Sequence, residues 1–495
     1  MLRQRFEHLD NSRSGLKAIA EECSKLTIRY IFPPEGTDFN TELGTPYQSV
    51  GSRGVNNLAS KLLTTILPPD GGFFRLTIPE YIKAQLQPDT ITQLEDQIAL
   101  AERVILQELA DLPIRQPLFE ALKHLLITGN VAVWLKEDKM AVYSLRDFVV
   151  VRDKTNKLVE VILRESIDLD ALPDDLRDFV EENRLSKIDQ ENPMADQENP
   201  SVDIYTGFKL ENNKWHKWQE IDDLEVPDSD ETFKELPVYI LRYTDTQYGR
   251  GLVEQHLGDL RTLEALSKAL TEGSLISAKA IFLVNPVGTT NAKKLAKAAN
   301  GDIIEGNPND VGTLQVQKQA DFSVALSRIS DLENRLNQVF LIFQPRQAER
   351  VTAEEIRRLT EELESLLGGV YSLLSEELQK PLVKTVYEKL KKEGKIPPFP
   401  DDIKLVITTG FEALSKTAAL NKLFTLLQAI APIQEAWQYV NWSEYLSRIL
   451  QSLNIDPKGL TKSDEQLMAE AEELMRQQAM LQQSQEPQET QGTLR

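Results

Sequence analysis

The most regular feature of this chain is the recurrence of apolar residues every three or four positions. Such spacing is typical of amphipathic helices that bury one face. It predicts helices in these stretches: 1–30, 51–67, 92–112, 252–279, 321–341 and two further stretches after residue 411. The stretch 252–279 has a narrow leucine seam, and a helix of roughly 28 residues would form a rod of about 42 Å.

The segment "RVTAEEIRRLTEELESLLGGVYSLLSEELQKP" (350–381) has the strongest helical pattern. Thr352 is a good N-cap, and Glu355 three residues later completes a capping box. We therefore expect a helix that begins at Val351–Thr352 and ends before Pro381, because proline disrupts a helix interior. The glycine pair Gly368-Gly369 predicts a bend or a close backbone contact, and a merely kinked core helix is the alternative.

Two regions show the alternating pattern of strands. After a helix that stops at Thr128-Gly129-Asn130, the pattern predicts strands at 131–135, 141–151 and 158–163. Together they suggest a small α+β layer.

Further on, "VDIYTGFKL" and "KWHKWQEI" flank "ENN" and predict a β-hairpin, followed by a strand at "PVYILRY" (237–243). We expect residues 201–243 to form a compact β-rich insertion. Two polar segments should form no packed core: 170–200, which contains "DQENP" twice, and the glutamine-rich 477–491.

The charge balance limits how this chain can treat nucleic acid. It has 77 acidic and 56 basic residues among 495, a formal charge of −21. Tight nucleic-acid binders usually present a basic face. Tight binding over most of the surface is therefore excluded, whereas guidance without adhesion is not. Acidity as a plain solubility feature is the alternative.

Several kinds of chemistry are missing from the sequence. Cys23 is the single cysteine, which excludes an internal disulfide and a multi-cysteine zinc site. The chain contains no phosphate-binding G-x-x-x-x-G-K-[ST] motif, no H-E-x-x-H and no G-x-S-x-G. No apolar run approaches the ~18–20 residues of a membrane span. We expect no catalytic site, metal, cofactor or membrane association.

Five blocks of the sequence, in the family's order, resemble the portal (head–tail connector) proteins of short-tailed, coliphage-type podoviruses. The blocks are "TPYQSVGSRGVNNLASKLL" (45–63), "LFEALKHLLITGNV" (118–131), "YGRGLVEQHLGDLRTLEAL" (248–266), "ADFSVALSRISDLENRL" (320–336) and "RVTAEEIRRLTEELESLLGGVYSLLSEELQKPLV" (350–383). The likeness spans most of residues 15–430 and is weakest at 186–200 and at the glutamine-rich end.

This resemblance implies an α+β, mostly helical portal fold with a wing, a stem of paired helices, a clip and a crown. Subunits would form a ring, typically of twelve copies, at one vertex of the virion capsid after assembly in the host cytoplasm. Double-stranded DNA would pass through the channel during packaging and ejection. The implied partners are the terminase large subunit, the major capsid and scaffolding proteins, the tail adaptor and internal core or ejection proteins. The alternative is an acidic helical scaffold or adaptor without a channel.

The resemblance also implies a division of this chain into family regions. They are a wing region at 1–169, stem and clip with the β-rich insertion at 170–248, a long stem helix at 249–284, a wing α/β region at 285–341, a tunnel loop at 342–351, the channel helix and wing at 352–410, crown helices at 411–475 and a flexible tail at 476–495.

Candidate site residues follow from this division. The tunnel-loop candidates are Gln344, Arg346, Gln347 and Arg350; the channel-helix candidates are Glu354, Arg357, Arg358, Gly368 and Gly369; the clip candidates are Trp215 and Trp218. Arginine contacts to phosphate are independent of sequence, as a conduit requires. Pairing of Arg346 and Arg350 with acidic residues of neighbouring chains is the alternative, as is plain packing for the two tryptophans.

Overall fold

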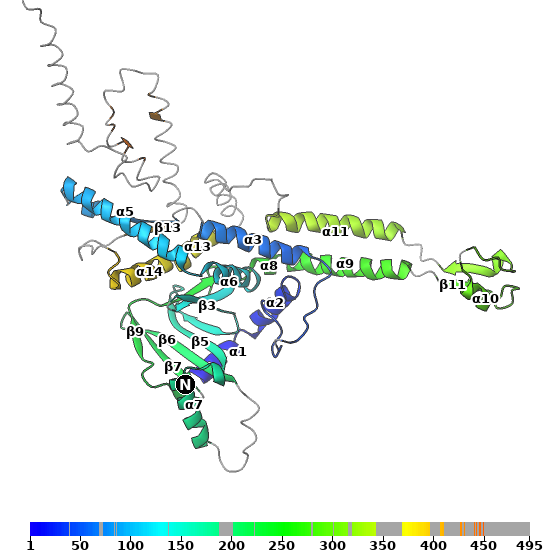
Figure 1. Cartoon of the computed structure of the whole chain (residues 1–495), viewed down its shortest axis with the longest axis horizontal. Coiled ribbons are helices and arrows are strands. Elements are labelled where there is room, and N and C mark those ends of the chain that lie inside the picture. Colours follow the sequence, from blue (N-terminus) through cyan, green and yellow to red (C-terminus); the bar gives the residue numbers. More distant parts are fainter. Residues whose placement is uncertain are drawn as a thin grey trace, which may run out of the picture. The chain divides into compact units, whose positions relative to one another are not determined.

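A computed structural model describes residues 1–68, 73–187, 201–342, 369–396 and 406–409, together with isolated positions between 426 and 449. Within these ranges, residues 39, 84, 86, 137, 222, 279–280, 300 and 315–318 are not described. The chain forms two compact units, one made of 1–74 with 104–395 and the other of 75–103 with 396–495. Figure 1 shows the helices and strands in chain order.

The smaller unit is described through a few elements. Strand β1 (Phe74–Thr77) pairs with β13 (Val406–Thr409), and α4 (Glu80–Lys83) and most of α5 (Pro88–Asp111) follow β1. The buried carboxylate of Glu102 accepts hydrogen bonds from the backbone N–H of Leu76 (2.6 Å) and from Arg75 (2.9 Å). This pairing compensates the cost of burying a charge.

The larger unit contains a six-stranded antiparallel sheet. Its order is β4-β5-β6-β7-β8, and β9 also pairs with β7. The strands are β4 (Phe148–Arg152), β5 (Leu158–Asp168), β6 (Ser201–Glu211), β7 (Lys214–Ile221), β8 (Leu224–Glu225) and β9 (Glu231–Phe233). The short helix η1 (Leu169–Ala171) and α7 (Asp174–Lys187) follow β5. The expectation that 170–200 forms no packed core is therefore wrong for its described part, because Leu172 and Val180 belong to a buried cluster with residues of β6 and β7.

The predicted hairpin is confirmed, but the expectation that residues 201–243 form a compact insertion of their own is wrong. Asn212 and Asn213 at the turn have φ of 49° and 63°, the left-handed pair that asparagine tolerates in tight hairpins. However, β6 also pairs along its length with β5, from Glu160↔Lys209 to Asp168↔Ser201. Residues 201–221 are thus the continuation of a sheet that begins at residue 148.

A second, three-stranded sheet has the order β10-β2-β3, with β2 (Asn130–Lys136), β3 (Lys139–Tyr143) and β10 (Val238–Arg242). The single strand predicted at 141–151 is therefore wrong, since its two halves belong to different sheets. A turn separates them: the Asp147 N–H donates to the Ser144 carbonyl (2.9 Å), and the Ser144 hydroxyl donates to the Asp147 carboxylate (2.5 Å).

The main apolar core combines both sheets with α2 (Ser14–Lys25). Phe148, Val161 and Phe208 of the large sheet belong to one buried cluster with Ala132 and Val238 of the small one. Leu2 and Phe6 of α1 (Leu2–Asn11) form another buried cluster with residues of β4, β5 and β6. The helical stretch predicted over residues 1–30 is thus two helices that belong to different clusters.

Two glycine-containing segments meet where α6 (Arg115–Thr128) ends, close to α3 (Val50–Ile66). Gly129 caps α6 with φ of 78°, a left-handed conformation that favours glycine. The Asn130 side chain donates to the Gly249 carbonyl (2.8 Å) and accepts from the Gly249 N–H (2.7 Å). The helix stop predicted at Thr128-Gly129-Asn130 is confirmed, and its glycine packs directly against a distant loop.

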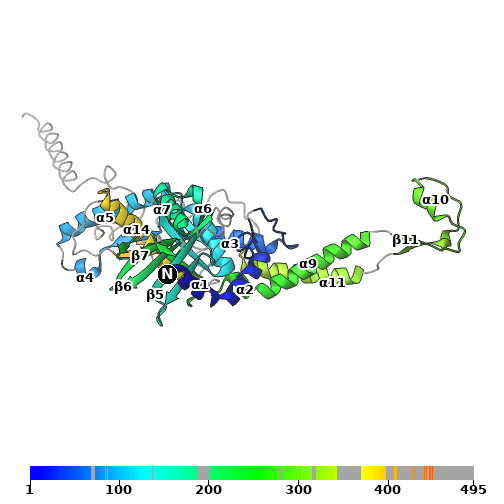
Figure 2. The ribbon, with the colours of Figure 1, turned by 90° about the horizontal axis from the view of Figure 1, so that it is seen from below.

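The predicted helix 252–279 is interrupted once, near its start. It consists of α8 (Leu252–Gln255) and α9 (Leu257–Ala278), because the backbone at His256 departs from helical geometry (φ −113°, ψ 15°). Helix α11 (Gln319–Val339) lies antiparallel beside α9: Phe322 approaches Gly273, and Arg335 pairs with Asp259 (2.8 Å). Both views show this pair, which we call the rod (Figures 1 and 2).

The chain between the two rod helices forms a small tip. Strands β11 (Ile281–Val284) and β12 (Val311–Leu314) pair antiparallel, with α10 (Ala292–Lys297) and the short helix η3 (Pro308–Asp310) between them. The Asp310 carboxylate accepts hydrogen bonds from the N–H groups of Thr289 (2.8 Å) and Thr290 (3.2 Å). These contacts fix the loop that leads from β11 to α10.

The prediction that the helix ends before Pro381 is wrong. Helix α13 (Val370–Leu374) continues through a π turn (Ser375–Gln379) into α14 (Lys380–Lys392), and Pro381 lies at the start of α14. A π turn is wider than an α turn, and such turns are associated with irregular helix geometry and kinks. The wide turn just before Pro381 offers a physical reason why proline is tolerated inside this continuous helix.

Candidate functional site

Burial along the rod decreases from its base towards the tip. The base residues Leu257, Leu260 and Leu263 of α9 and Leu332 and Leu336 of α11 are all buried. Leu266 and Leu270 are only partly buried. The leucine seam predicted from the sequence is therefore confirmed, but a single subunit covers it only near the base.

Large apolar residues are exposed on the outer half of the rod and on the tip. Leu275 of α9 is 63% exposed, and Val324 of α11 is 70% exposed. On the tip, Val287 is 91% and Ile303 100% exposed. Large exposed apolar residues of this kind are candidates for surfaces that bind another protein.

The tip also carries a basic pocket of about 420 Å³. Lys293, Lys294 and Lys297 of α10 line it together with Asp302 and Ile303. Asn291 starts α10 by accepting from the N–H groups of Lys293 and Lys294, so these lysines lie on an ordered helical turn. The pocket combines positive charge with a fully exposed apolar side chain in an acidic protein.

A buried ion pair holds the π turn to the three-stranded sheet. The Glu377 carboxylate accepts from the side chain of Arg242 (2.7 Å) and from the Arg242 N–H (3.3 Å). The two side chains are only 17% and 9% exposed. Burial raises the pKa of Glu377 above its usual range, although the hydrogen bond from Arg242 opposes this shift.

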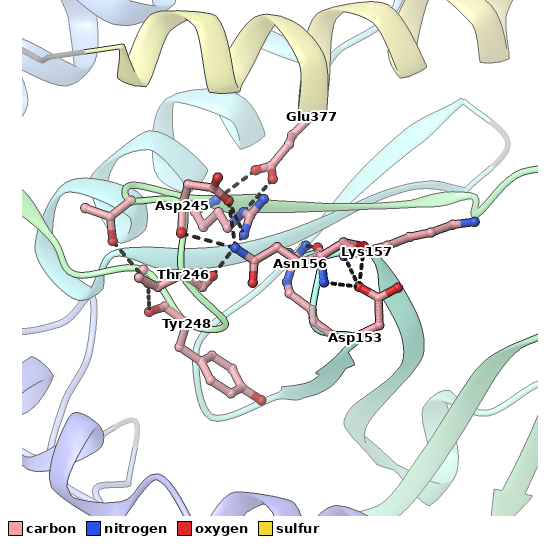
Figure 3. A network of polar contacts seen from close by, with 12 residues as sticks. Asp153, Asn156, Lys157, Asp245, Thr246, Tyr248 and Glu377 are labelled. Carbon is pink, nitrogen blue, oxygen red and sulfur yellow. Dashed lines mark hydrogen bonds and ion pairs between the residues drawn. The ribbon is translucent and has the colours of Figure 1, made fainter.

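Figure 3 shows how this pair extends into a polar network. Arg242 also reaches Asp245 (2.8 Å), and the Asn156 side chain donates to the carboxylate of the same Asp245 (3.2 Å). Arg152 donates to the Asn156 carbonyl (2.9 Å), and burial lowers the pKa of this guanidinium, helped by the nearby Arg242 charge. The network joins the β4–β5 turn, the loop after β10 and the π turn.

A second polar contact fixes the other end of the π turn. The fully buried Gln379 side chain donates to the carbonyl of Ile66, the last residue of α3 (2.8 Å). Carbonyls at helix ends have no partner within their own helix. Glu377 and Gln379 thus fix one helical turn between β10 and α3.

Most of the predicted channel residues lie outside the described residues: Gln344, Arg346, Gln347, Arg350, Glu354, Arg357, Arg358 and Gly368. Gly369 is described and stands at the start of α13 with φ of 91°. A Cβ on Gly369 would meet nothing within 4 Å among the described residues. The left-handed backbone conformation at Gly369 is therefore sufficient reason for a glycine at this position.

The two tryptophans proposed for the clip pack within their own subunit. Trp215 is 8% exposed and belongs to the main core, opposite Leu210 on β6 and Phe233 on β9. Trp218 is partly buried against the Leu2 and Phe6 cluster. The structure brings the two tryptophans to different clusters, and it brings neither to the tip.

Sequence reasoning missed the Arg242–Glu377 pair. Glu377 lies in "LLSEELQKP", where its charge suggests an exposed helix position, and Arg242 ends an apolar strand. The only signal in the sequence for burial of Glu377 was its position on the side of the helix that also carries Leu373 and Leu374. In the described part of the chain no cluster of His, Cys, Asp or Glu could hold a metal, and no helix is apolar enough to cross a membrane.

The molecule is thus a mixed helix-and-sheet protein whose rod and tip expose large apolar side chains. Residues 1–460 match the family model described as bacteriophage head to tail connecting protein. The chain is 38% identical over 484 residues to the portal protein of Enterobacteria phage T3, covering 94% of this chain and 88% of that protein. It therefore belongs to the family of bacteriophage head-to-tail connecting proteins, and the resemblance seen in its sequence is confirmed.

Two further relatives agree with this membership. The portal protein of Escherichia phage T7 is 37% identical over 482 residues, which cover 93% of this chain and 88% of that protein. The portal protein of Pseudomonas phage phiKMV is 29% identical over 483 residues, covering 94% and 93%. The similarity thus extends over nearly the full length of each relative.

Proposed function

We propose that this chain is a viral portal subunit. Copies of it form a ring, typically of twelve, at one capsid vertex, and double-stranded DNA passes through the ring during packaging and ejection. The relatives named as portal proteins support this function. The structural observation that carries the ring is the rod, whose apolar seam is covered only at its base. A scaffold without a channel is less favoured, because the matched relatives are portal proteins.

The rod and the tip suggest a revised assignment of the family regions. We assign the stem to the antiparallel pair α9 and α11. Helix α11 had been expected in the wing region 285–341, so this assignment moves it from the wing to the stem. The clip is then the tip at 281–314 rather than the hairpin at 201–221, whose tryptophans are used in the subunit's own core. The basic pocket of the tip is the surface proposed for docking the terminase large subunit and later the tail adaptor. The major capsid, scaffolding and internal core proteins are the other proposed partners.

Replacing the exposed rod residues tests the ring. The double change Leu275→Glu with Val324→Glu places charges where neighbouring rods would meet, and burial of each apolar side chain contributes roughly 1.5–3 kcal/mol. We expect the concentration needed for ring formation to rise at least about tenfold, measured by native mass spectrometry and negative-stain microscopy.

The matched control is Leu100→Glu, a similar change at a residue of α5 that is 45% exposed. It should leave ring formation unchanged, and all variants should keep the wild-type circular dichroism. A wild-type protein that stays monomeric at every concentration would refute the ring. Rings of normal stability in the double variant would refute the role of the rod face.

The residues that we propose to contact DNA lie outside the described part of the chain. We propose that Arg346 and Arg350 face the channel and touch phosphate without reading sequence. Changing both to alanine should shorten the packaged genome or weaken its retention, measured by the length of DNA in filled particles. Unchanged packaging and retention would show that these arginines serve another role, such as pairing between subunits.

A further inference from the structure

A second basic pocket lies at the base of the rod. It has a volume of about 420 Å³ and lies between the end of α2, the loop 44–47 and the first turns of α9. We call it the α2–α9 pocket. Four basic side chains line it, against two acidic ones: Lys25, Arg29, Arg261 and Lys268, with Glu22 and Glu264.

Both carboxylates of the pocket already have partners inside the subunit. Glu264 accepts hydrogen bonds from the N–H groups of Tyr47 (3.0 Å) and Gln48 (3.2 Å). Glu22 accepts from Arg261 (2.5 Å), and this hydrogen bond holds the pKa of Glu22 below its usual range. The pocket lining, with four basic and two acidic side chains, therefore keeps a formal excess of positive charge.

Three of the basic side chains keep donor capacity. Lys25 is exposed, and Arg29 donates from one terminal nitrogen to the Gly44 carbonyl (3.2 Å), while its buried Nε has no hydrogen-bond partner among the described residues. Lys268 has only a long contact with Glu272 (3.9 Å), in which both side chains are 54% exposed. Exposed pairs of this kind contribute little. The pocket is thus a positive site on a chain whose formal charge is −21.

An exposed aromatic residue borders these charges. Tyr47 is 51% exposed, and the Lys268 ammonium lies 6.0 Å from the centre of its ring. Tyrosine and arginine are enriched where protein interfaces gain most of their binding energy. The composition of the pocket therefore fits a protein partner with carboxylate groups.

The pocket is continuous with the open face of the rod. Arg261, Lys268 and Leu275 follow one another at intervals of seven residues on α9, so they lie close to one line along the helix. The first two line the pocket, and the third is the exposed leucine of the proposed subunit contact. A partner that covers Leu275 would reach the pocket along the same face.

We propose that the α2–α9 pocket receives a carboxylate-bearing segment of a second copy of this chain, next to the rod contact. This inference rests on the proposed ring and adds a charged anchor to its apolar contact. The acidic character of the chain supplies the complementary charge. Because the pocket is open to solvent, its contribution should weaken as salt screens the charges.

Charge reversal tests the anchor. The double variant Arg29→Glu with Lys268→Glu should raise the concentration for ring formation at least tenfold, as measured by native mass spectrometry. The matched control reverses the same charges at two exposed lysines in or beside the large sheet, Lys154→Glu with Lys214→Glu, and should form rings as the wild type does. If Arg29→Glu disturbs folding, as judged by circular dichroism, the exposed Lys268→Glu alone provides the measurement, with at least a threefold effect expected.

A second experiment identifies the occupant directly. Carbodiimide joins lysine to a carboxylate in contact with it, and rings assembled from mixed light and heavy isotope-labelled subunits distinguish links between copies. We expect a link from Lys25 or Lys268 to an Asp or Glu of another copy. Links confined to one copy, together with normal rings in the variants, would overturn the inference while leaving the ring intact. Pocket-dependent binding of a short DNA duplex, with normal rings, would also overturn it. A wild type without rings would instead refute the proposed function.

Discussion

Replacing Arg242 with methionine is expected to destabilise the unassembled subunit by about 3–5 kcal/mol at neutral pH, because it leaves a buried carboxylate without its partner. Glu377 accepts two hydrogen bonds from Arg242, and its side chain is only 17% exposed. The shift in the urea midpoint of the subunit measures this loss. Hydrogen exchange should also increase across the π turn and α14, since Glu377 holds that turn to β10.

The effect of pH gives this prediction a second readout. Burial already raises the pKa of Glu377 in the folded protein, and loss of Arg242 removes an opposing interaction. A carboxyl group with a raised folded pKa binds its proton more tightly in the folded state. The penalty is therefore present above that folded pKa and disappears as the pH falls towards the unfolded value. The difference between variant and wild type should shrink at acidic pH.

The double variant Arg242→Met with Glu377→Leu is the control. Replacing both members of a buried pair with apolar groups often costs far less than removing one. We expect the double variant to regain at least half of the lost stability. Equal losses in the single and double variants would show that the pair itself contributes little and that Arg242 acts through Asp245 and Thr246.

Gly129→Ala is expected to cost about 2–5 kcal/mol, from a left-handed backbone strained by roughly 1–2 kcal/mol and a clash of about 1–3 kcal/mol. A Cβ at Gly129 would lie 2.5 Å from the Gly251 nitrogen and 2.6 Å from the Gly249 carbonyl oxygen. These neighbours are backbone atoms and have little freedom to move aside. Thermal unfolding of the subunit measures the loss.

Gly36→Ala separates the two causes. Gly36 has almost the same φ, 75° against 78°, but its Cβ would meet nothing within 4 Å among the residues that the structure describes. The change at Gly36 should therefore cost only the backbone strain, roughly 1–2 kcal/mol. Similar losses at both positions would mean that the close approach of the 249–251 loop is unimportant for stability.

Local patterns in the sequence predicted features that depend on neighbouring residues. The hairpin at "ENN", the stop at Gly129 and the leucine seam of α9 all follow from turn chemistry or apolar spacing within one segment. The strand expected at 141–151 failed because the Ser144–Asp147 turn interrupts a stretch that is otherwise strand-like. The helix end expected at Pro381 failed because a single π turn precedes the proline.

Contacts between distant segments were beyond the reach of these patterns. Nothing near residue 377 in the sequence indicates Arg242 on a strand 135 positions earlier. The pairing of β6 with β5 joins two regions separated by an acidic stretch, so the hairpin looked independent. The family resemblance implied a pair of stem helices but did not indicate the packing of α11 against α9, which only the structure showed.

The declining burial along α9 also determines where the molecule opens first. The Leu260 side chain is fully buried, whereas Leu275 is 63% exposed. Local opening should therefore need progressively less free energy towards the outer end, and a protease would cut there before it reaches the base. An isolated subunit would thus be most vulnerable in the segment that the proposed neighbouring copy would cover.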